Sequence, residues 1–543
     1  MLVKATLLIS NTFIPGTLLS TLFYFLLCPA SLAARDIESG GIFSEWKISA
    51  VDYSSKPFSI KLDCASLSDW SEYPAQVLFA RKGNRENGLP EYCDVLGHIQ
   101  SNIKFRLFLP ARWNGRFFMV GNGGLAGDDL LQPQYPQHLK KMQAAIRHGF
   151  ATVMTDSGHA EKETPGGSFA HNNFSSEMDF AFRAIHAVSE TSKQLIEYVY
   201  EETPQRNYFD GCSGGGRQGL MSVQRYPNDF HGVVAGAPAF NHTAFAVGRM
   251  VFNPILNDAA ISMKQVSLLG KLITAECDEN DGLKDGLIEN PLSCKVNFDK
   301  LLPVCSVAGS ADNCFSEKQV SAIKLLHEDV YVNGERLQPG YPPGSDLSQS
   351  NGWHSWLPTD DPNKFDFGRM YSEELLRYIA FDKDDPARSL KDFDAARDVK
   401  NFGLAMRLID ATNPNIDRYH KAGGKLLMYI GWQDMAFSPR ATVEYYEELS
   451  KRYQEDTTEF VRLFMAPGMY HCFGGTGPNK FDYMTPLLNW VEKGIAPRKI
   501  IAHQFEDNEL IRSRPLCPWP ALAIYRGKGP VNVADSYTCQ SPR

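Results

Sequence analysis

The segment that most constrains the fold is the stretch RNYFDGCSGGGRQGLMSVQ, residues 206–224. It begins as a short strand-like run, passes through Gly211-Cys212-Ser213-Gly214-Gly215, and continues at once with helical spacing. In a G-x-S-x-G turn between a strand and a helix, small neighbours avoid a backbone clash and the serine is exposed. The pattern therefore predicts that a sheet and a helix meet at Ser213, a candidate nucleophile. The alternative is a glycine-rich turn with an incidental serine.

Strand-like and helical runs alternate over much of the chain. Helical spacing marks residues 177–200. Strands are predicted at residues 105–110, 116–124, 150–156, 206–213, 231–239, 425–434 and 461–471. Alternation of this kind predicts an α/β fold with a mainly parallel sheet flanked by helices.

The alternation breaks down between about residues 240 and 401. This stretch holds four cysteines, an acidic loop and a tract rich in proline, glycine and aromatic residues at 338–358. Long stretches of this kind inside a compact domain are usually functional. We predict a lid at residues 241–404, inserted between two parts of one catalytic domain at 35–240 and 405–543.

The N-terminus has the features of an export signal. Lys4 precedes a mostly apolar stretch that runs to Pro29, and small residues follow at a cleavage point near Ala33 or Ala34. We therefore predict a signal peptide at residues 1–34, with a retained membrane anchor as the alternative. No later stretch is long and apolar enough to span a bilayer, so the mature chain is expected to be secreted or periplasmic.

The cysteine count agrees with export. Of eleven cysteines, Cys28 lies in the predicted signal, and an even set of ten in an oxidising compartment predicts five disulfides. These ten are Cys64, Cys93, Cys212, Cys277, Cys294, Cys305, Cys314, Cys472, Cys517 and Cys539. Short spacing favours pairing within 277–294 and within 305–314, while the connectivity of the first two and last two cysteines stays open.

A nucleophilic serine needs a base, and the base needs an orienting carboxylate. In the fold predicted here these groups follow in the chain order serine, acid, histidine, on loops after later strands. Asp434 follows the predicted strand that starts at residue 425, and His471 ends the run at 461–471. His186 and His231 lie on predicted helix or strand edges, where a structural role is favoured.

Cysteines flank both the nucleophile and the base. Cys212 precedes Ser213 and Cys472 follows His471. A bridge between them would close a loop of about 260 residues, worth roughly 5 kcal/mol in the chain-entropy model. Its main effect would be to hold the serine and histidine loops side by side.

Together, Cys212-Ser213, Asp434 and His471-Cys472 resemble the CS-D-HC pattern of the tannase and feruloyl esterase family of α/β-hydrolases. The resemblance extends over nearly the whole mature chain and includes residues 155–160, 211–239, 465–475 and 512–529. It implies an α/β-hydrolase fold with a large lid, and a secreted serine esterase that hydrolyses feruloyl, galloyl or terephthalate monoesters through an acyl-enzyme. Many members carry threonine after the serine (CSTGG), where this chain has glycine, a departure outside the triad.

The oxyanion of an acyl-transfer intermediate needs backbone donors. Gly214, which follows the nucleophile, is one candidate. The second is expected from the GNGG loop at residues 121–124, with Gly124 preferred to Gly123 and a simple turn as the alternative. Phe437, three residues after Asp434, is the candidate substrate contact. Four lid aromatics could also stack on an acyl group, although most lid aromatics form its core: Trp353, Trp356, Tyr371 and Phe381.

The acidic loop between Cys277 and Cys294 carries Asp278, Asp281 and Asp285 among glycines. Hard oxygen donors at this spacing suit Ca²⁺, although the loop is not an EF-hand and a merely solvated surface is equally compatible. The family resemblance implies a structural calcium held by these three aspartates and by the main-chain oxygens of Leu283 and Leu287. No organic cofactor is expected.

The net charge of −8, without a basic block, argues against a nucleic-acid or anionic-membrane partner. The expected partner is a small aromatic ester. The competing hypothesis is a secreted interaction protein on a hydrolase scaffold without activity, but such a protein usually lacks a triad member, and all three are present here. The identity of the ester and the oligomeric state are not determined by the sequence.

Overall fold

The computed structural model describes residues 57–133, 136–306, 312–344, 347–349, 351–361 and 365–541. The predicted signal peptide, residues 1–34, lies outside these residues. Within the described ranges, no helix combines the length and the apolar character needed to cross a membrane.

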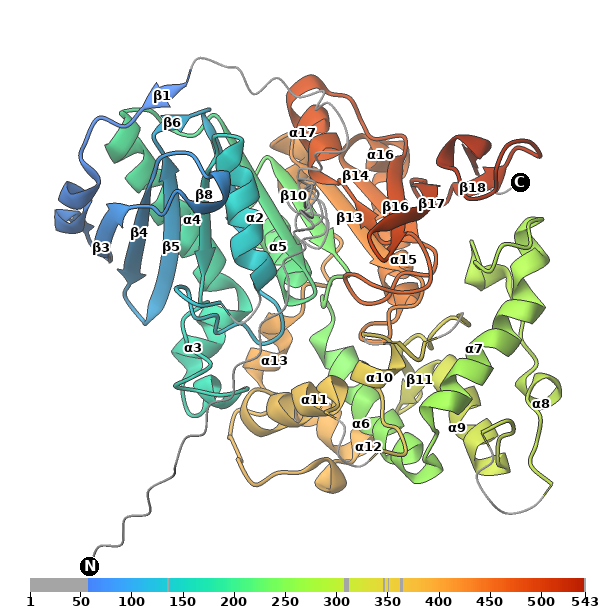
Figure 1. The fold of residues 1–543 in the computed structure, drawn as a ribbon. Helices are drawn as coiled ribbons and strands as arrows, with labels where there is room; N and C mark the ends of the chain where they lie inside the picture. Colours follow the sequence, from blue (N-terminus) through green and yellow to red (C-terminus); the bar gives the residue numbers. More distant parts are fainter. Residues whose placement is uncertain are drawn as a thin grey trace, which may run out of the picture.

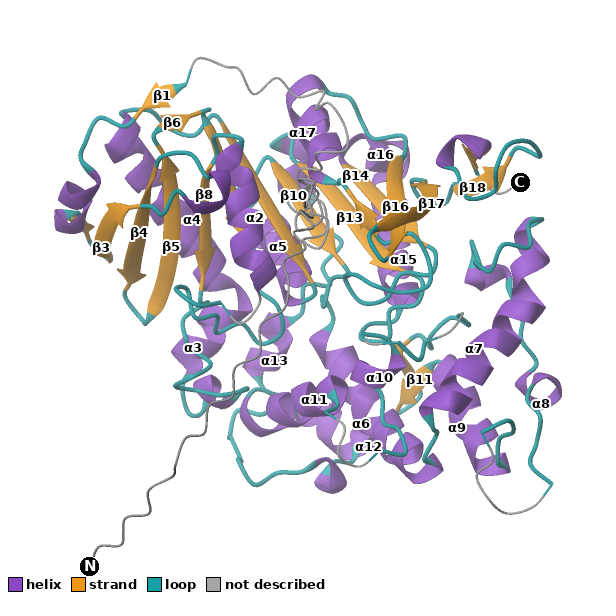
Figure 2. Ribbon diagram, in the orientation of Figure 1, coloured by secondary structure: helices purple, strands orange, loops and turns teal. Residues whose placement is uncertain are grey.

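One large mixed sheet runs across the upper half of the molecule in Figures 1 and 2. In the described chain its ten strands follow the order β14-β13-β10-β9-β7-β8-β5-β4-β3-β2. The strands are β2 (Ser71–Glu72), β3 (Ala75–Lys82), β4 (Tyr92–Ile99), β5 (Ile103–Pro110), β7 (Arg116–Val120), β8 (Ala151–Thr155), β9 (Arg206–Cys212), β10 (Gly232–Gly236), β13 (Lys425–Gly431) and β14 (Val461–Ala466). Neighbours from β8 to β14 pair in parallel, and neighbours from β2 to β8 pair antiparallel.

The α/β class predicted from the sequence is thus correct, and the parallel part carries every predicted site strand. The antiparallel strands β3 and β4 were not predicted. Asp94, Gly97 and His98 interrupt the apolar pattern of β4. Asp94 is nevertheless buried, because Arg106 of β5 donates to it over 2.8 Å. An ion pair that forms only across paired strands leaves no periodic signal in the sequence.

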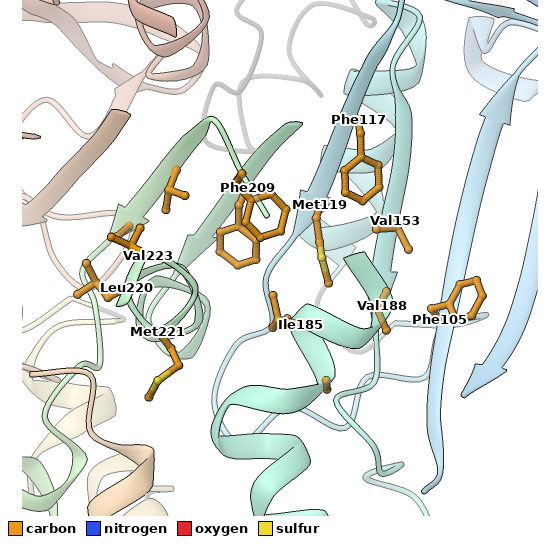
Figure 3. Close-up of a cluster of buried hydrophobic side chains, with 14 of the residues drawn as sticks. Phe105, Phe117, Met119, Val153, Ile185, Val188, Phe209, Leu220, Met221 and Val223 are labelled. Carbon is orange, nitrogen blue, oxygen red and sulfur yellow. The ribbon is translucent and has the colours of Figure 1, made fainter. Parts of the chain in front are cut away.

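Helices cover both faces of the sheet. One face is covered by α4 (Ala184–Tyr200), α5 (Gly214–Arg225) and α15 (Pro439–Tyr453), and the other by α2 (Pro136–Arg147) and α17 (Met484–Lys493). Because side chains alternate along a strand, Phe117 and Met119 of β7 enter the first apolar core (Figure 3), whereas Phe118 and Val120 enter the second.

The helix predicted at residues 177–200 is interrupted in the structure. It consists of α3 (Phe174–Met178), a π-helical turn at Asp179–Arg183, and α4. A π-turn changes the backbone pairing locally, and here the buried guanidinium of Arg217 donates to the carbonyl oxygens of Phe180 and Ala181 over 2.9 and 2.7 Å. Arg217 of α5, the helix that follows Ser213, therefore binds the carbonyls of this π-helical turn.

Between β10 and β13 the chain leaves the sheet and forms a helical layer, which we call the inserted segment (residues 237–424; Figure 2). Its elements are α6 (His242–Ala259), α7 (Met263–Cys277), α8 (Phe298–Leu301), α9 (Glu317–His327), β11 (Val330–Val332), β12 (Glu335–Gln338), α10 (Trp353–Trp356), α11 (Phe367–Tyr378), α12 (Ala395–Asp398), α13 (Leu404–Ile409) and α14 (Asp417–Lys421). Met435, Ala436 and Tyr470 pack into one of its apolar clusters. The loops after β13 and β14 are therefore partly buried by the inserted segment.

The C-terminal part adds two small antiparallel sheets. α16 (Thr457–Phe460) precedes β14; β15 (Lys480–Phe481), β16 (Ile500–Glu506) and β17 (Glu509–Leu516) form one sheet, and β18 (Leu522–Tyr525) pairs with β19 (Tyr537–Gln540). A further short pair joins β1 (Phe58–Ser59) to β6 (Arg112–Trp113).

Five disulfides join the ten cysteines outside the predicted signal. They are Cys64–Cys93, Cys212–Cys472, Cys277–Cys294, Cys305–Cys314 and Cys517–Cys539. The pairs favoured by the sequence are present, and the two pairs that it left open are now assigned.

Candidate active site

Ser213 occupies the sharp turn between β9 and α5. Its backbone has φ 62° and ψ −121°, a conformation that is costly for any residue with a side chain. Two backbone hydrogen bonds from the β10 side support it: Ser213 donates to the Gly236 carbonyl, and Ala239 donates to the Ser213 carbonyl, both over 3.0 Å. The strained turn is therefore held by hydrogen bonds to β10 and to the segment that follows β10.

Two of the glycines after Ser213 allow other backbone segments to approach. A Cβ on Gly216 would lie 2.4 Å from the carbonyl oxygen of Gly236, and a Cβ on Gly214 would lie 2.7 Å from that of Gly124. Real Cβ contacts are not this short, because the facing atoms belong to backbone that cannot move aside. The glycine run thus lets α5 begin against β10 on one side and against the GNGG loop on the other.

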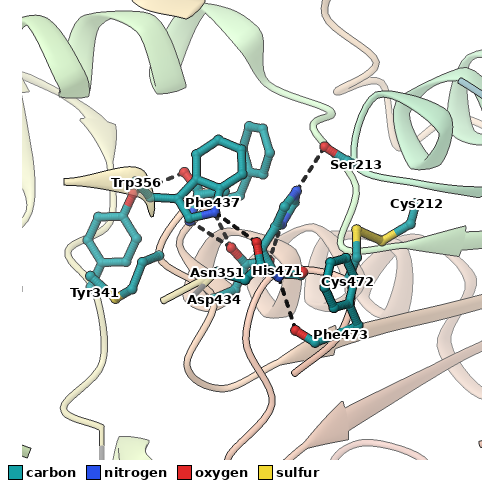
Figure 4. Close-up of polar contacts among 12 residues, drawn as sticks. Cys212, Ser213, Tyr341, Asn351, Trp356, Asp434, Phe437, His471, Cys472 and Phe473 are labelled. Atoms are coloured by element: carbon teal, nitrogen blue, oxygen red, sulfur yellow. Dashed lines mark hydrogen bonds and ion pairs between the residues drawn. A yellow bond between two sulfur atoms is a disulfide. The ribbon is translucent and has the colours of Figure 1, made fainter. Parts of the chain in front are cut away.

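The structure brings Ser213, His471 and Asp434 into one hydrogen-bonded chain (Figure 4). The Ser213 Oγ lies 2.9 Å from Nε2 of His471, and Nδ1 of His471 lies 2.8 Å from Oδ2 of Asp434. With the proton on Nδ1, His471 donates a hydrogen bond to Asp434, and Nε2 is free to accept one from the serine hydroxyl.

Asp434 is fixed in turn by its own loop. Its Oδ1 accepts from the amides of Ala436 and Phe437 over 2.8 and 3.0 Å, and the residue is only 1% exposed. A buried carboxylate with both oxygens engaged cannot rotate freely. Its orientation therefore sets that of the imidazole.

The disulfide Cys212–Cys472 lies beside this chain, with a Cα–Cα distance of 6.1 Å and a sequence separation of 260 residues. It joins the residue before Ser213 to the residue after His471. Ser213 and His471 are therefore tied covalently, through one residue on each side.

The GNGG loop is held by a buried polar network that sequence reasoning missed. Asn122 donates through Nδ2 to the Thr155 carbonyl over 2.6 Å and to Asp128 over 3.1 Å. Its Oδ1 accepts from Ser157 and Gln218, and its amide donates to Oε1 of Gln218 over 2.9 Å. Gln218 belongs to α5, so the loop is attached to the same helix that begins at Gly214. Only the folded arrangement reveals this, because the five residues come from distant parts of the sequence.

Aromatic side chains surround the imidazole. The ring centroid of Phe437 lies 5.4 Å from that of His471, and the ring of Trp356 meets His471 edge-on at 4.9 Å. Of the other aromatics named from the sequence, Tyr371 stacks behind Trp356 at 6.0 Å. Trp353 is fully buried in the core of the inserted segment, and Phe381 packs on Phe402 at 5.5 Å. Phe437 and Trp356 are therefore the two of this set that contact the ring of His471.

Arg249 of α6 is a further residue that the sequence did not reveal. Its guanidinium donates to the carbonyl oxygens of Trp356 (2.9 Å), Ala436 (3.0 Å) and Met435, and the residue is 1% exposed. A buried arginine that gives several hydrogen bonds to carbonyls fixes backbone segments relative to one another. Here it joins the loop after Asp434 to α10 of the inserted segment.

The two other histidines named from the sequence have structural partners. Nδ1 of His186 lies 2.9 Å from Asp229, and Nδ1 of His231 accepts from the amide of Asn207 over 3.0 Å. Among the described residues, His186, Glu190 and Asp229 form one group with the spacing of metal ligands. The ammonium of Lys193 already pairs with Glu190 over 2.9 Å.

The acidic loop lies far from Ser213, Asp434 and His471 in the sequence. Its carboxylates accept hydrogen bonds from backbone amides of the same loop. Oδ2 of Asp278 accepts from the Gly286 amide over 2.9 Å, and Oδ1 of Asp281 accepts from the Leu283 amide over 2.9 Å. Burial, together with the nearby carboxylates of Asp285 and Asp278, raises the pKa of Asp281 to about 6. Grouped, desolvated carboxylates of this kind fit a hard cation such as Ca²⁺. Arg514 of β17 already pairs with Asp285, so part of the negative charge is balanced by the chain itself.

The chain is similar in sequence or in structure to several known proteins. The sequence profile of the family described as tannase and feruloyl esterase matches residues 89–540. A mono(2-hydroxyethyl) terephthalate hydrolase from Piscinibacter sakaiensis is 32% identical over 518 residues, which cover 84% of this chain and 85% of the relative. A probable feruloyl esterase B-2 from Aspergillus terreus is 32% identical, with 81% and 83% of the two chains covered. The crystal structure of feruloyl esterase B from Aspergillus oryzae superposes with a TM-score of 0.76 at 26% identity, covering 88% of this chain and 99% of that one.

Proposed function

The chain belongs to the tannase and feruloyl esterase family, and from this premise we propose that it hydrolyses esters of aromatic acids with Ser213 as nucleophile, His471 as base and Asp434 as orienting acid. It is a carboxylic ester hydrolase, as its relatives are. The observation that carries the proposal is the continuous hydrogen-bonded chain from Ser213 Oγ through His471 to Asp434. A scaffold without activity would have no need of this alignment.

The proposed reaction has two halves. Nε2 of His471 removes the hydroxyl proton while Oγ of Ser213 bonds to the ester carbonyl carbon, and the same proton passes to the departing alcohol. Water then attacks the acyl-enzyme with His471 again as base, which releases the acid and restores the serine. Asp434 stabilises the imidazolium in both halves without itself taking the proton.

Gly214 and Gly124 are the proposed oxyanion donors, with Gly123 as the second choice in the loop. Gly214 is the first residue of α5, where amides have no partner within the helix. Within the described chain, neither the Gly214 nor the Gly124 amide donates a recorded backbone hydrogen bond. Their close approach supports a shared role, because two free amides near the nucleophile suit the charge that develops on the carbonyl oxygen.

The aromatic preference is proposed from the names of the relatives and from the rings beside His471. A hydrolysis panel of methyl ferulate, methyl gallate and mono(2-hydroxyethyl) terephthalate tests it, with p-nitrophenyl acetate as the control for a small acyl group. We expect at least one aromatic ester to exceed the acetate in kcat/KM by about tenfold or more. If only the acetate is hydrolysed, the protein is an esterase, but the proposed preference for aromatic acyl groups is wrong.

Replacing Phe437 by alanine is expected to raise KM for the preferred aromatic ester about tenfold, because one stacking ring is worth on the order of 1 kcal/mol or more. The effect on p-nitrophenyl acetate should be much smaller. Phe393→Ala is the matched control, since Phe393 packs on Phe402 of the inserted segment at 6.5 Å. Equal losses on both esters, or in both variants, would remove Phe437 from the substrate site.

Export and calcium complete the proposal. We propose that residues 1–34 are a signal peptide and that the mature enzyme is secreted or periplasmic, a view supported by the five disulfides, which persist in oxidising compartments. We also propose a structural Ca²⁺ held by Asp278, Asp281, Asp285 and the main-chain oxygens of Leu283 and Leu287. When bound, it would supply charge balance to the loop and take no part in the reaction.

Chelation of this calcium is expected to lower Tm by several degrees, because an ion that binds only the folded state at about 100 times its Kd stabilises it by about 2.7 kcal/mol. Asp281→Asn should have a lower Tm than the wild type without chelator, and chelator should change the Tm of this variant little. Asp299→Asn is the control, since Asp299 lies in the same segment and pairs with Lys324. An unchanged Tm on chelation, together with no bound metal in elemental analysis, would contradict the proposal.

A further inference from the structure

Asn351 lies between β12 and α10 in the inserted segment, yet its side chain contacts the loop that carries the base (Figure 4). Its Nδ2 donates to the carbonyl oxygen of His471 over 2.5 Å and to that of Phe473 over 3.0 Å. Its Oδ1 accepts from the indole Nε1 of Trp356 over 3.3 Å. The amide thus joins the backbone on both sides of Cys472 to the tryptophan that meets the His471 ring.

The backbone of Asn351 is built for this orientation. Its φ of 71° lies in the left-handed region, which asparagine tolerates better than most residues. Its own amide donates to the hydroxyl of Ser355 over 3.0 Å, within the turn that leads into α10. The turn therefore fixes the backbone of Asn351, and three hydrogen bonds fix its side chain.

The loop at residues 471–473 receives support from two directions. The disulfide fixes Cys472 to the end of β9, and Asn351 fixes the carbonyls that flank it. Phe473 is 57% exposed, so this side of the loop gains little from apolar packing. Without the amide, the main chain of His471 would lose this hydrogen bond to the inserted segment.

We propose that Asn351 is a positioning residue for His471, through which the inserted segment sets the alignment of the catalytic base. The proposal rests on the proposed function, since it assigns a role only if His471 serves Ser213. The Nε2–Oγ contact of 2.9 Å depends on where the His471 main chain lies. Misplacement of a reacting group by about 1 Å can cost on the order of a hundredfold in rate.

Two variants test the side-chain amide of Asn351 while keeping its positive-φ backbone conformation. Asn351→Asp keeps the size and the tolerance of positive φ but cannot donate, and Asn351→Gly keeps the conformation without a side chain. Asn333→Asp and Asn333→Gly are the matched controls. Asn333 also lies in the inserted segment with φ 53°, and its Nδ2 donates to the Ala396 carbonyl over 3.0 Å, away from the triad.

The measurements are the labelling rate with a fluorophosphonate, kcat and KM on an ester, and Tm. In labelling, Ser213 Oγ bonds to phosphorus, fluoride leaves, and His471 takes the serine proton, so the rate reports the pair without depending on the natural substrate. We expect both Asn351 variants to lower the labelling rate and kcat by about ten- to a hundredfold. We expect KM to change by less than about threefold and Tm to match the Asn333 controls.

Rates equal to wild type in either Asn351 variant would overturn the proposal. The proposal would also be overturned if the rates fell only in proportion to the folded fraction, or if neither Asn351 variant folded. Equal losses of rate in the Asn333 variants would have the same consequence. Each of these results would make the role of Asn351 structural. Failure of the proposed function is a separate result: wild-type protein would then not be labelled at Ser213. The Asn351 comparison presupposes that labelling.

Discussion

Ser213→Ala is expected to abolish ester hydrolysis, with kcat lowered at least about a thousandfold, because it removes only the attacking oxygen and leaves the strained turn in place. His471→Ala should be comparably severe. Asp434→Asn should cost somewhat less, because it disturbs the tautomer and the orientation of the imidazole rather than the attack itself. Each rate is to be measured by single-turnover hydrolysis of the preferred ester, at a folded fraction checked by circular dichroism.

Ser222→Ala is the matched control for this experiment. Ser222 is buried on the same helix, α5, and its hydroxyl donates to the Gln218 carbonyl over 2.9 Å. Its loss should leave kcat nearly unchanged. Turnover of Ser213→Ala above about a thousandth of wild type would point to a different nucleophile.

Removing the Cys212–Cys472 bridge is expected to lower kcat by about a hundredfold at equal folded fraction, when both cysteines are replaced by serine. The Ser213–His471 contact needs hydrogen-bond geometry, and a small shift between the two loops weakens proton transfer steeply. Stability should also fall, by up to roughly 5 kcal/mol for a loop of this length. Initial rates on the preferred ester, normalised to folded protein, measure the first effect.

The matched control removes Cys305–Cys314, which spans 9 residues in the inserted segment. That variant should lose stability without a comparable loss of kcat. Peptide mapping without reduction checks the bridge directly, by finding one fragment that joins the segments around Cys212 and Cys472. Pairing of Cys212 with any other cysteine, or its alkylation as a free thiol, would contradict this account of why a cysteine stands beside each catalytic residue.

Local signals in the sequence were sufficient for the elements that carry the site. The strand, the glycine turn and the helix around Ser213 are adjacent in the chain, and Asp434 and His471 each follow a strongly apolar strand. Their meeting in space followed from the chain order of the groups, which a parallel sheet brings to one edge.

Interactions between distant segments could not be predicted in the same way. Asn122 is held by Gln218 and Ser157, and Asn351 reaches a carbonyl 120 residues away. Nothing in the local pattern distinguishes Asn351 from Asn333, which occupies a similar turn. Likewise, the sequence predicts that Asp94 is exposed, whereas its ion pair with Arg106 of the neighbouring strand allows it to be buried.

The Cys212–Cys472 bond also makes the polypeptide from 212 to 472 a covalent ring, with the whole inserted segment inside it. A protease that cuts once within that segment therefore cannot release either half of the enzyme. The nicked protein migrates as one molecule without reductant and as two with it, and the serine and histidine stay on fragments joined beside the reaction centre. A single cut in this long segment outside the sheet therefore leaves the two parts of the chain joined.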